Sequence, residues 1–141
     1  PLIYNVFRAE AVCTYDLSQK KYVEAYRAPF TGAVDIALAK ERNEVLATSS
    51  WLDQIWVLSA DELEHKRTLH IRPGVRPVGY NPETGYGYTI ESFTGYLVEF
   101  DVETGDEISR MYAGRNARKI YYFNDFGMVF LTGCGVFRLV E

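Results

Sequence analysis

Five arginines stand in short segments between the predicted strands of this chain, and guanidinium is well suited to binding carboxylates and phosphates. The sequence as a whole is acidic, with a formal net charge of −4 at pH 7. Unpaired cations at close range repel one another, so arginines brought together by a fold favour an anionic counter-charge. The five are Arg27, Arg72, Arg76, Arg115 and Arg118.

Histidines and the known catalytic motifs offer little chemistry. His65 and His70 are five residues apart, so on one strand their side chains point to opposite faces and do not form a metal-ligand pair. The sequence has no HExxH, no GxSxG and no P-loop, and the glycines Gly85 and Gly87 precede a predicted strand, unlike those of a dinucleotide-binding loop. We therefore predict no catalytic residue, no metal site and no cofactor in this sequence.

The remaining reactive side chains favour structural roles. Asp16 and Asp101 recur at strand ends, where an aspartate accepts backbone N–H bonds and caps a turn, and this role is favoured over paired acid–base work. Cys13 and Cys134 both lie in apolar, strand-like segments. We expect two free, buried thiols that behave as small hydrophobic side chains, and a disulfide between them is the alternative.

Composition and charge narrow the classes of protein. The acidic balance argues against a general nucleic-acid or polyanion binder, and no apolar stretch reaches the roughly 18 residues that a membrane-spanning helix needs. The chain is 48% hydrophobic and 15% aromatic, which favours a sizeable core built from strands.

Six tyrosines are expected to pack between sheets rather than to form a stacking platform. They are Tyr80, Tyr86, Tyr88, Tyr96, Tyr121 and Tyr122.

A repeat of 42 residues organises the chain. When the sequence is shifted by this length, apolar residues, turn residues and glycines fall on one another without a gap from residue 32 to residue 69, and a second shift extends the register. Corresponding positions include Gly32 with Gly74, Ile36 with Val78 and then Ile120, Trp51 with Phe93, Arg76 with Arg118, and Gly85 with Gly127.

Each repeat reads as four short strands joined by tight turns, which is typical of a β-propeller blade. Asp61 to Thr68 has helical propensity, but its place in the repeat predicts a turn and an outer strand. Propellers generally contain four to eight blades. The sequence therefore predicts an all-β fold, an incomplete ring of about three and a third blades belonging to one propeller domain: residues 1–30 as a partial blade, 31–73 and 74–114 as complete blades, and 115–141 as a partial blade.

The stretch from Gly74 to Ile90, followed by Gly95 to Gly105, resembles the YVTN-type β-propeller repeat. It carries a Gly-x-x-Pro start, an Asn-Pro-Glu-x-Gly turn and an Asp-x-x-Thr-Gly turn. The resemblance is good over 74–114, partial over 115–141 and fair over 31–73, which has Asp35 in place of the proline and Asn43 in place of the turn glycine. It implies a bacterial or archaeal propeller of seven blades or so, often exported and used as a binding scaffold, and it carries over no catalytic residue.

The blade prediction places the arginines together. In a propeller, the crossings between blades lie on one rim, around the mouth of the central channel, beside the hairpins at 49–53 and 91–95. We name this predicted site the arginine rim; an anion or a protein partner would suit it, whereas the alternative is that the arginines bind carbonyls and carboxylates of the adjoining blade. Its residues are Arg72, Arg76, Arg115, Arg118, Trp51 and Phe93.

Two classes of function remain open at this stage, because fold alone does not decide between them. The favoured one is a non-enzymatic β-propeller scaffold or binding module that contacts a protein partner or a small ligand, with further blades supplied by the same chain or by a neighbouring subunit. The alternative is a part of a propeller enzyme, such as a quinone-, haem- or metal-dependent oxidoreductase or a lactonase-like hydrolase, with its active residues outside this segment. The resemblance implies a periplasmic or extracellular location, and a cytoplasmic one stays open.

Overall fold

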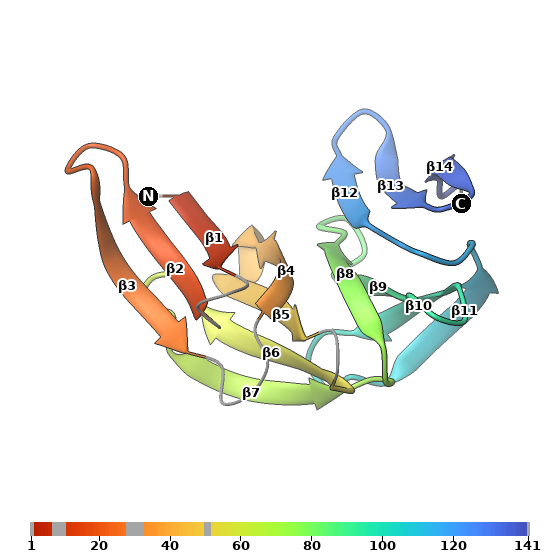
Figure 1. The fold of residues 1–141 in the computed structure, drawn as a ribbon, viewed down its shortest axis with the longest axis horizontal. Helices are drawn as coiled ribbons and strands as arrows, with labels where there is room; N and C mark the ends of the chain where they lie inside the picture. Colours follow the sequence, from red (N-terminus) through yellow and green to blue (C-terminus); the bar gives the residue numbers. More distant parts are fainter. Residues whose placement is uncertain (1, 7–10, 28–32, 50–51, 141) are drawn as a thin grey trace.

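The computed structural model describes residues 2–6, 11–27, 33–49 and 52–140, and these form antiparallel β-sheets (Figure 1). In every sheet the strands are neighbours in chain order, which is the arrangement that successive hairpins produce. The first sheet holds β1 (Leu2–Val6), β2 (Ala11–Asp16) and β3 (Lys21–Arg27). The second holds β4 (Ala33–Ala39), β5 (Glu44–Ser49), β6 (Gln54–Ser59) and β7 (His65–His70).

The third and fourth sheets repeat this pattern. A 3₁₀ turn at Lys40–Arg42 joins β4 to β5, and the other hairpins whose connections are fully described close with turns as well. The third sheet holds β8 (Val75–Tyr80), β9 (Tyr86–Glu91), β10 (Tyr96–Asp101) and β11 (Glu107–Tyr112). The fourth holds β12 (Lys119–Phe123), β13 (Gly127–Thr132) and β14 (Gly135–Arg138).

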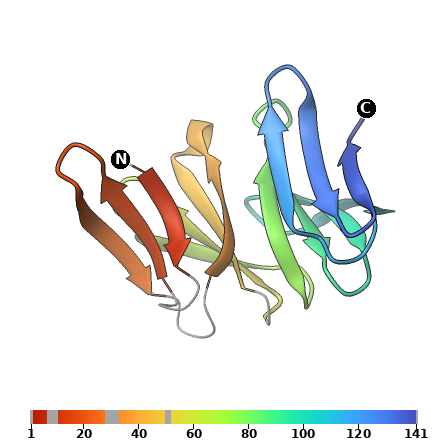
Figure 2. The same cartoon turned by 45° about the horizontal axis from the view of Figure 1, so that its top comes forward.

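The sheets are arranged side by side as blades, with their first strands toward a common centre (Figures 1 and 2). β8 lies between β4 and β12 and contacts both. Ile36, Val78 and Ile120 lie on these three inner strands, as the repeat predicted. Residues 65–70 form the outer strand β7 rather than a helix, so the repeat is a better guide here than local propensity.

Apolar side chains from facing sheets fill the space between blades. Trp56 of the second sheet packs with Val12 of the first, and Val57 packs with Phe100 of the third. Tyr88 of the third sheet packs with Met128 of the fourth. Each sheet is therefore buried on a face by its neighbour, which is the packing expected for blades.

The turn at Asn43 explains how the second blade departs from the repeat. Asn43 has a φ of 51°, and Gly85 and Gly127 at the corresponding positions have φ angles of 76° and 71°. Asparagine tolerates this left-handed backbone better than most residues that carry a Cβ. The missing glycine therefore leaves the turn conformation in place.

Both aspartates predicted to cap turns do so. Asp16 accepts the backbone N–H of Ser18 at 2.8 Å and that of Gln19 at 3.0 Å. Asp101 accepts the N–H of Glu103 at 2.7 Å and that of Thr104 at 3.0 Å. A hydrogen bond from the Ser18 hydroxyl, together with the backbone bonds, lowers the pKa of Asp16, and the backbone bonds from Thr104 and Glu103 lower that of Asp101.

Some expectations for cysteine and tyrosine need correction. No disulfide joins Cys13 to Cys134, and Cys134 is exposed rather than buried, because it lies in the turn between β13 and β14. Tyr80 and Tyr88 are buried between sheets as predicted, but two of the six tyrosines are exposed. These are Tyr96, which packs edge-on against Tyr112, and Tyr121.

Among the described residues, no helix is long and apolar enough to cross a membrane.

Candidate functional site

Backbone hydrogen bonds bring the interblade crossings and the hairpins onto one rim. The Ser92 N–H donates to the Gly74 carbonyl at 3.0 Å, and the Asn116 N–H donates to the Ser92 carbonyl at 3.0 Å. The Gly133 N–H reaches the Arg115 carbonyl at 2.8 Å. The crossings that carry Arg72, Arg115 and Arg118 therefore stand beside the hairpin that carries Phe93. Arg76, predicted in a crossing, is the second residue of strand β8.

The arginines of this rim differ in their partners. Arg72 Nε lies 3.0 Å from Glu107 Oε2 and 3.6 Å from Glu91 Oε1, which are the intramolecular contacts of the packing alternative. Within the described part of the chain, the side chains of Arg76, Arg115 and Arg118 make no hydrogen bond or ion pair. Arg76 Nε is buried and has no hydrogen-bond partner there.

Other side chains complete the rim. Phe93 is 66% exposed and lies against Gly74, where an added Cβ would come within 2.8 Å of the Phe93 ring. Glu91 is almost fully buried and is held by Arg110 Nη2 at 2.9 Å, so its charge is compensated within the blade. Trp51 lies outside the described residues, as does the side chain of Arg27.

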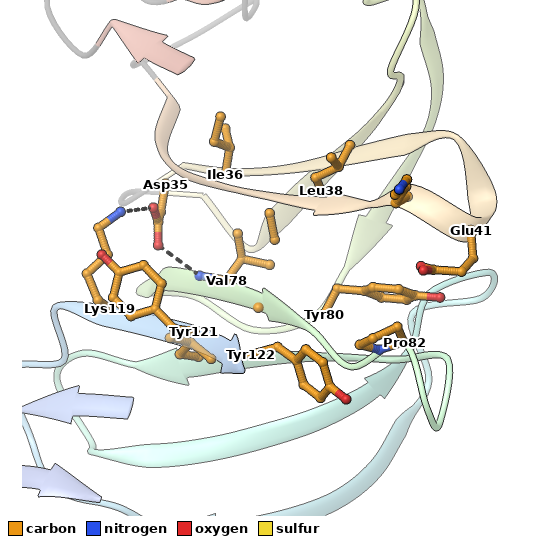
Figure 3. A pocket seen from close by; sticks show the side chains of 14 residues that line it. Asp35, Ile36, Leu38, Glu41, Val78, Tyr80, Pro82, Lys119, Tyr121 and Tyr122 are labelled. Atoms are coloured by element: carbon orange, nitrogen blue, oxygen red, sulfur yellow. Dashed lines mark hydrogen bonds and ion pairs between the residues drawn. The ribbon is translucent and has the colours of Figure 1, made fainter. Parts of the chain in front are cut away.

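Apart from the arginine rim, a hollow lies along the three inner strands, and we call it the inner groove. It has a volume of about 330 Å³ and is bordered by β4, β8 and β12 (Figure 3). In Figure 3 one end carries Asp35 and Lys119, and the other carries Tyr80 and Glu41. Ile36, Leu38, Val78, Tyr121 and Tyr122 line the rest together with other residues of the same strands.

Asp35 ties the three inner strands together. Its carboxylate accepts the backbone N–H of Val78 at 3.3 Å and is hydrogen-bonded and ion-paired to Lys119 Nζ. Asp35 is 4% exposed, whereas the Lys119 side chain is 44% exposed. Burial raises the pKa of Asp35, and the ion pair with Lys119 opposes that rise.

Tyrosines give the groove much of its surface. Tyr80 is buried, and burial raises the pKa of its phenol. The Tyr122 hydroxyl donates to Glu83 Oε1 at 2.8 Å, and that bond raises the pKa of Tyr122. Tyr121 is about half exposed and stands near the Asp35–Lys119 pair in Figure 3. The groove thus combines aromatic rings with a buried carboxylate that a partly exposed lysine compensates.

Sequence reasoning missed the Asp35–Lys119 pair, although the repeat contains a sign of it. Asp35, Pro77 and Lys119 are successive positions 42 residues apart, so they stand at one level of three adjacent inner strands. The proline of the repeat is thus replaced by an acid in one blade and by a base two blades later. Because these inner strands surround the central axis, the opposite charges of Asp35 and Lys119 at equivalent positions indicate that the two side chains form an ion pair.

Comparison with solved structures supports the architecture. Kuenenia stuttgartiensis hydrazine synthase, a β-propeller-containing protein, matches with a TM-score of 0.73 over 87% of this chain, at 12% sequence identity. The described sheets are β-propeller blades. The chain spans 36% of that matched chain, so the likeness concerns the fold alone. No protein-family model matches the sequence. No curated protein shows significant sequence similarity to it.

Proposed function

We propose that this chain is a non-enzymatic β-propeller binding module whose arginine rim contacts an anionic ligand or an acidic protein surface. The observation that carries the proposal is the lack of any described carboxylate partner for Arg76, Arg115 and Arg118. Three guanidinium groups left uncompensated on the rim of an acidic chain provide charge that an anion can use.

The surroundings of these arginines support binding from solvent. Arg115 and Arg118 are exposed, and Phe93 presents an exposed ring on the same rim. Arginine and aromatic residues are enriched at protein interfaces, where guanidinium groups pair with carboxylates and rings supply apolar contact. Arg72 differs because Glu107 and Glu91 already compensate it, so we assign it a structural part in the rim.

The test replaces Arg76 and Arg118 together by alanine and measures binding of a hexaglutamate peptide by calorimetry at low salt. The affinity should fall about a hundredfold, because each of the two lost charge-assisted contacts removes about 1.5 kcal/mol. Urea unfolding should change by less than about 1 kcal/mol, because Arg118 is exposed and the half-buried Arg76 side chain makes no described hydrogen bond that its removal would break. Added salt should weaken the wild-type interaction.

The matched control removes the same charge elsewhere. Lys20 ends the turn before β3 and Lys21 begins that strand, and both are exposed. The Lys20→Ala/Lys21→Ala chain therefore has the same net charge as the double arginine variant. It should bind hexaglutamate like the wild type. A double arginine variant that unfolds more easily yet binds the peptide normally would show that these arginines serve packing, and the proposal would be wrong.

A further inference from the structure

The two partners in the inner groove differ in how firmly they are held. The Asp35 carboxylate is 4% exposed and accepts the Val78 N–H, so it is fixed in the wall of the groove. Lys119 is 44% exposed and carries its charge at the end of a flexible four-carbon stem. When the ammonium of Lys119 moves into solvent it gains hydration that offsets part of the lost ion pair, whereas the Asp35 carboxylate is fixed and cannot move into water. Of the two charges, the cation is the exchangeable one.

We propose that the inner groove binds a small organic amine, whose ammonium group takes the place of Lys119 Nζ on Asp35. Lys119 then acts as an internal occupant that an incoming amine displaces into solvent. The exchange keeps one cation beside the buried carboxylate and leaves the Val78 hydrogen bond unchanged. No uncompensated charge is buried in either state, which is the condition under which such a site is tolerated.

An anionic ligand is disfavoured at the same place. It would have to pair with Lys119 and draw that ammonium away from Asp35, which would leave a buried carboxylate without a counter-charge. Breaking a buried pair in this way is strongly unfavourable. The acidic side chain of Glu41 also lies along the groove, although the neighbouring Lys40 compensates it in net charge.

The remaining lining suits the hydrocarbon part of an amine. Ile36, Val78 and the rings of Tyr80, Tyr121 and Tyr122 border the same hollow. Aromatic ring faces attract ammonium groups, and the effect grows when water is excluded. A volume of about 330 Å³ lies at the small end of the range for ligand pockets and fits a small amine.

This inference goes beyond the arginine rim, because it concerns other side chains and a ligand of the opposite charge. Calorimetric titration of the full chain with n-butylamine provides the test, with n-butanol and butyrate as neutral and anionic probes of similar size. Butylamine should bind, and the two other probes should bind at least tenfold more weakly.

Three variants assign the contact. Asp35→Asn should weaken butylamine binding about ten- to a hundredfold, because one charge-assisted hydrogen bond is lost. Lys119→Met should tighten it about tenfold, because the internal competitor is removed. Lys21→Met, a matched loss of an exposed lysine on β3, should leave the affinity unchanged.

A measurement on the wild type keeps the test decisive if a variant fails to fold. Saturating butylamine should move the side-chain Cε–H NMR signals of Lys119 toward those of a solvated lysine and leave those of Lys21 in place. The proposal would be overturned if butyrate or butanol bound as well as butylamine. It would equally be overturned if the Lys119 signals did not move, or if Lys119→Met bound butylamine no better than the wild type.

Discussion

Glu44 of the second blade has more ion-pair partners than any other described carboxylate, and its replacement by glutamine removes that charge. The Glu44 side chain is 3% exposed and lies 2.7 Å from Arg67 Nη1, 2.6 Å from Lys66 Nζ and 3.0 Å from Arg42 Nε. Arg67 also donates to the Val102 carbonyl of the third sheet at 2.7 Å. Glu44 therefore positions Arg67, whose guanidinium group makes a hydrogen bond from the second blade to the third.

The pKa of Glu44 gives the size of the effect. Burial raises the pKa, but the hydrogen bonds from Arg67, Lys66 and Arg42 outweigh it and lower the pKa from 4.5 to about 2. At about 1.4 kcal/mol per pKa unit, the folded state gains about 3 kcal/mol from this ionised carboxylate near neutral pH. Glutamine keeps the size of the side chain but not the charge, so Glu44→Gln should lower the free energy of unfolding by about 3 kcal/mol at pH 7.

The pH dependence follows from the sign of this shift. A carboxyl group whose folded-state pKa is lowered stabilises the protein above its unfolded pKa, and the contribution is lost as pH falls through the folded pKa. Urea unfolding of the wild type and of Glu44→Gln should therefore differ fully at pH 6 to 7. The difference should shrink between about pH 4.5 and pH 2, because the wild type alone loses this contribution there.

Glu103→Gln is the matched control. Glu103 contacts Arg42 and lies 3.4 Å from Arg67 Nη2, but its side chain is 62% exposed. An exposed ion pair contributes less than about 1 kcal/mol, so this variant should unfold almost like the wild type. The reasoning about Glu44 would be refuted if both variants lost the same stability at pH 7. A Glu44→Gln deficit that stayed constant down to pH 2 would refute it as well.

Two further substitutions test the packing between blades by urea unfolding. Gly87→Ala should lower the free energy of unfolding by about 1–3 kcal/mol, because the new Cβ would lie 2.3 Å from Phe100 Cζ. Adding Phe100→Leu should restore part of this stability, and additive effects of the two changes would contradict this account. Tyr88→Phe should lower the free energy of unfolding by about 1–2 kcal/mol, because the hydroxyl of this buried tyrosine donates to Glu99. Tyr112→Phe, on an exposed ring, should leave the stability almost unchanged, and equal losses of stability in the two variants would contradict the prediction.

The blades could be predicted because the repeat supplies information that single residues do not. Residues 61–68 favour a helix by propensity, yet the register with the next repeat places a turn and an outer strand there, and β7 is observed at His65–His70. The same register predicted the turn at Asn43, although that residue departs from the glycine of the other repeats. Tertiary packing against neighbouring blades outweighs local preference at both places.

The partners of individual charges could not be read from the repeat. Arg72 and Arg76 look alike in the sequence, but only Arg72 comes within reach of Glu107, a residue of the outer strand β11. Asp35 and Lys119 are 84 residues apart, and their contact depends on the spacing of three inner strands. Such distances depend on blade packing, which a pattern of residue types along one chain does not measure.

Arg118 and Lys119 show how one crossing can serve two sites of opposite preference. Consecutive residues of an extended chain direct their side chains to opposite sides. Lys119 reaches the carboxylate of Asp35 in the inner groove, whereas the exposed Arg118 pairs with no described carboxylate. The cation that is compensated leaves a carboxylate for an amine to bind, and the cation that is not compensated remains available to an anion. Adjacent positive residues therefore need not form a single anion site, and the two experiments proposed above separate them.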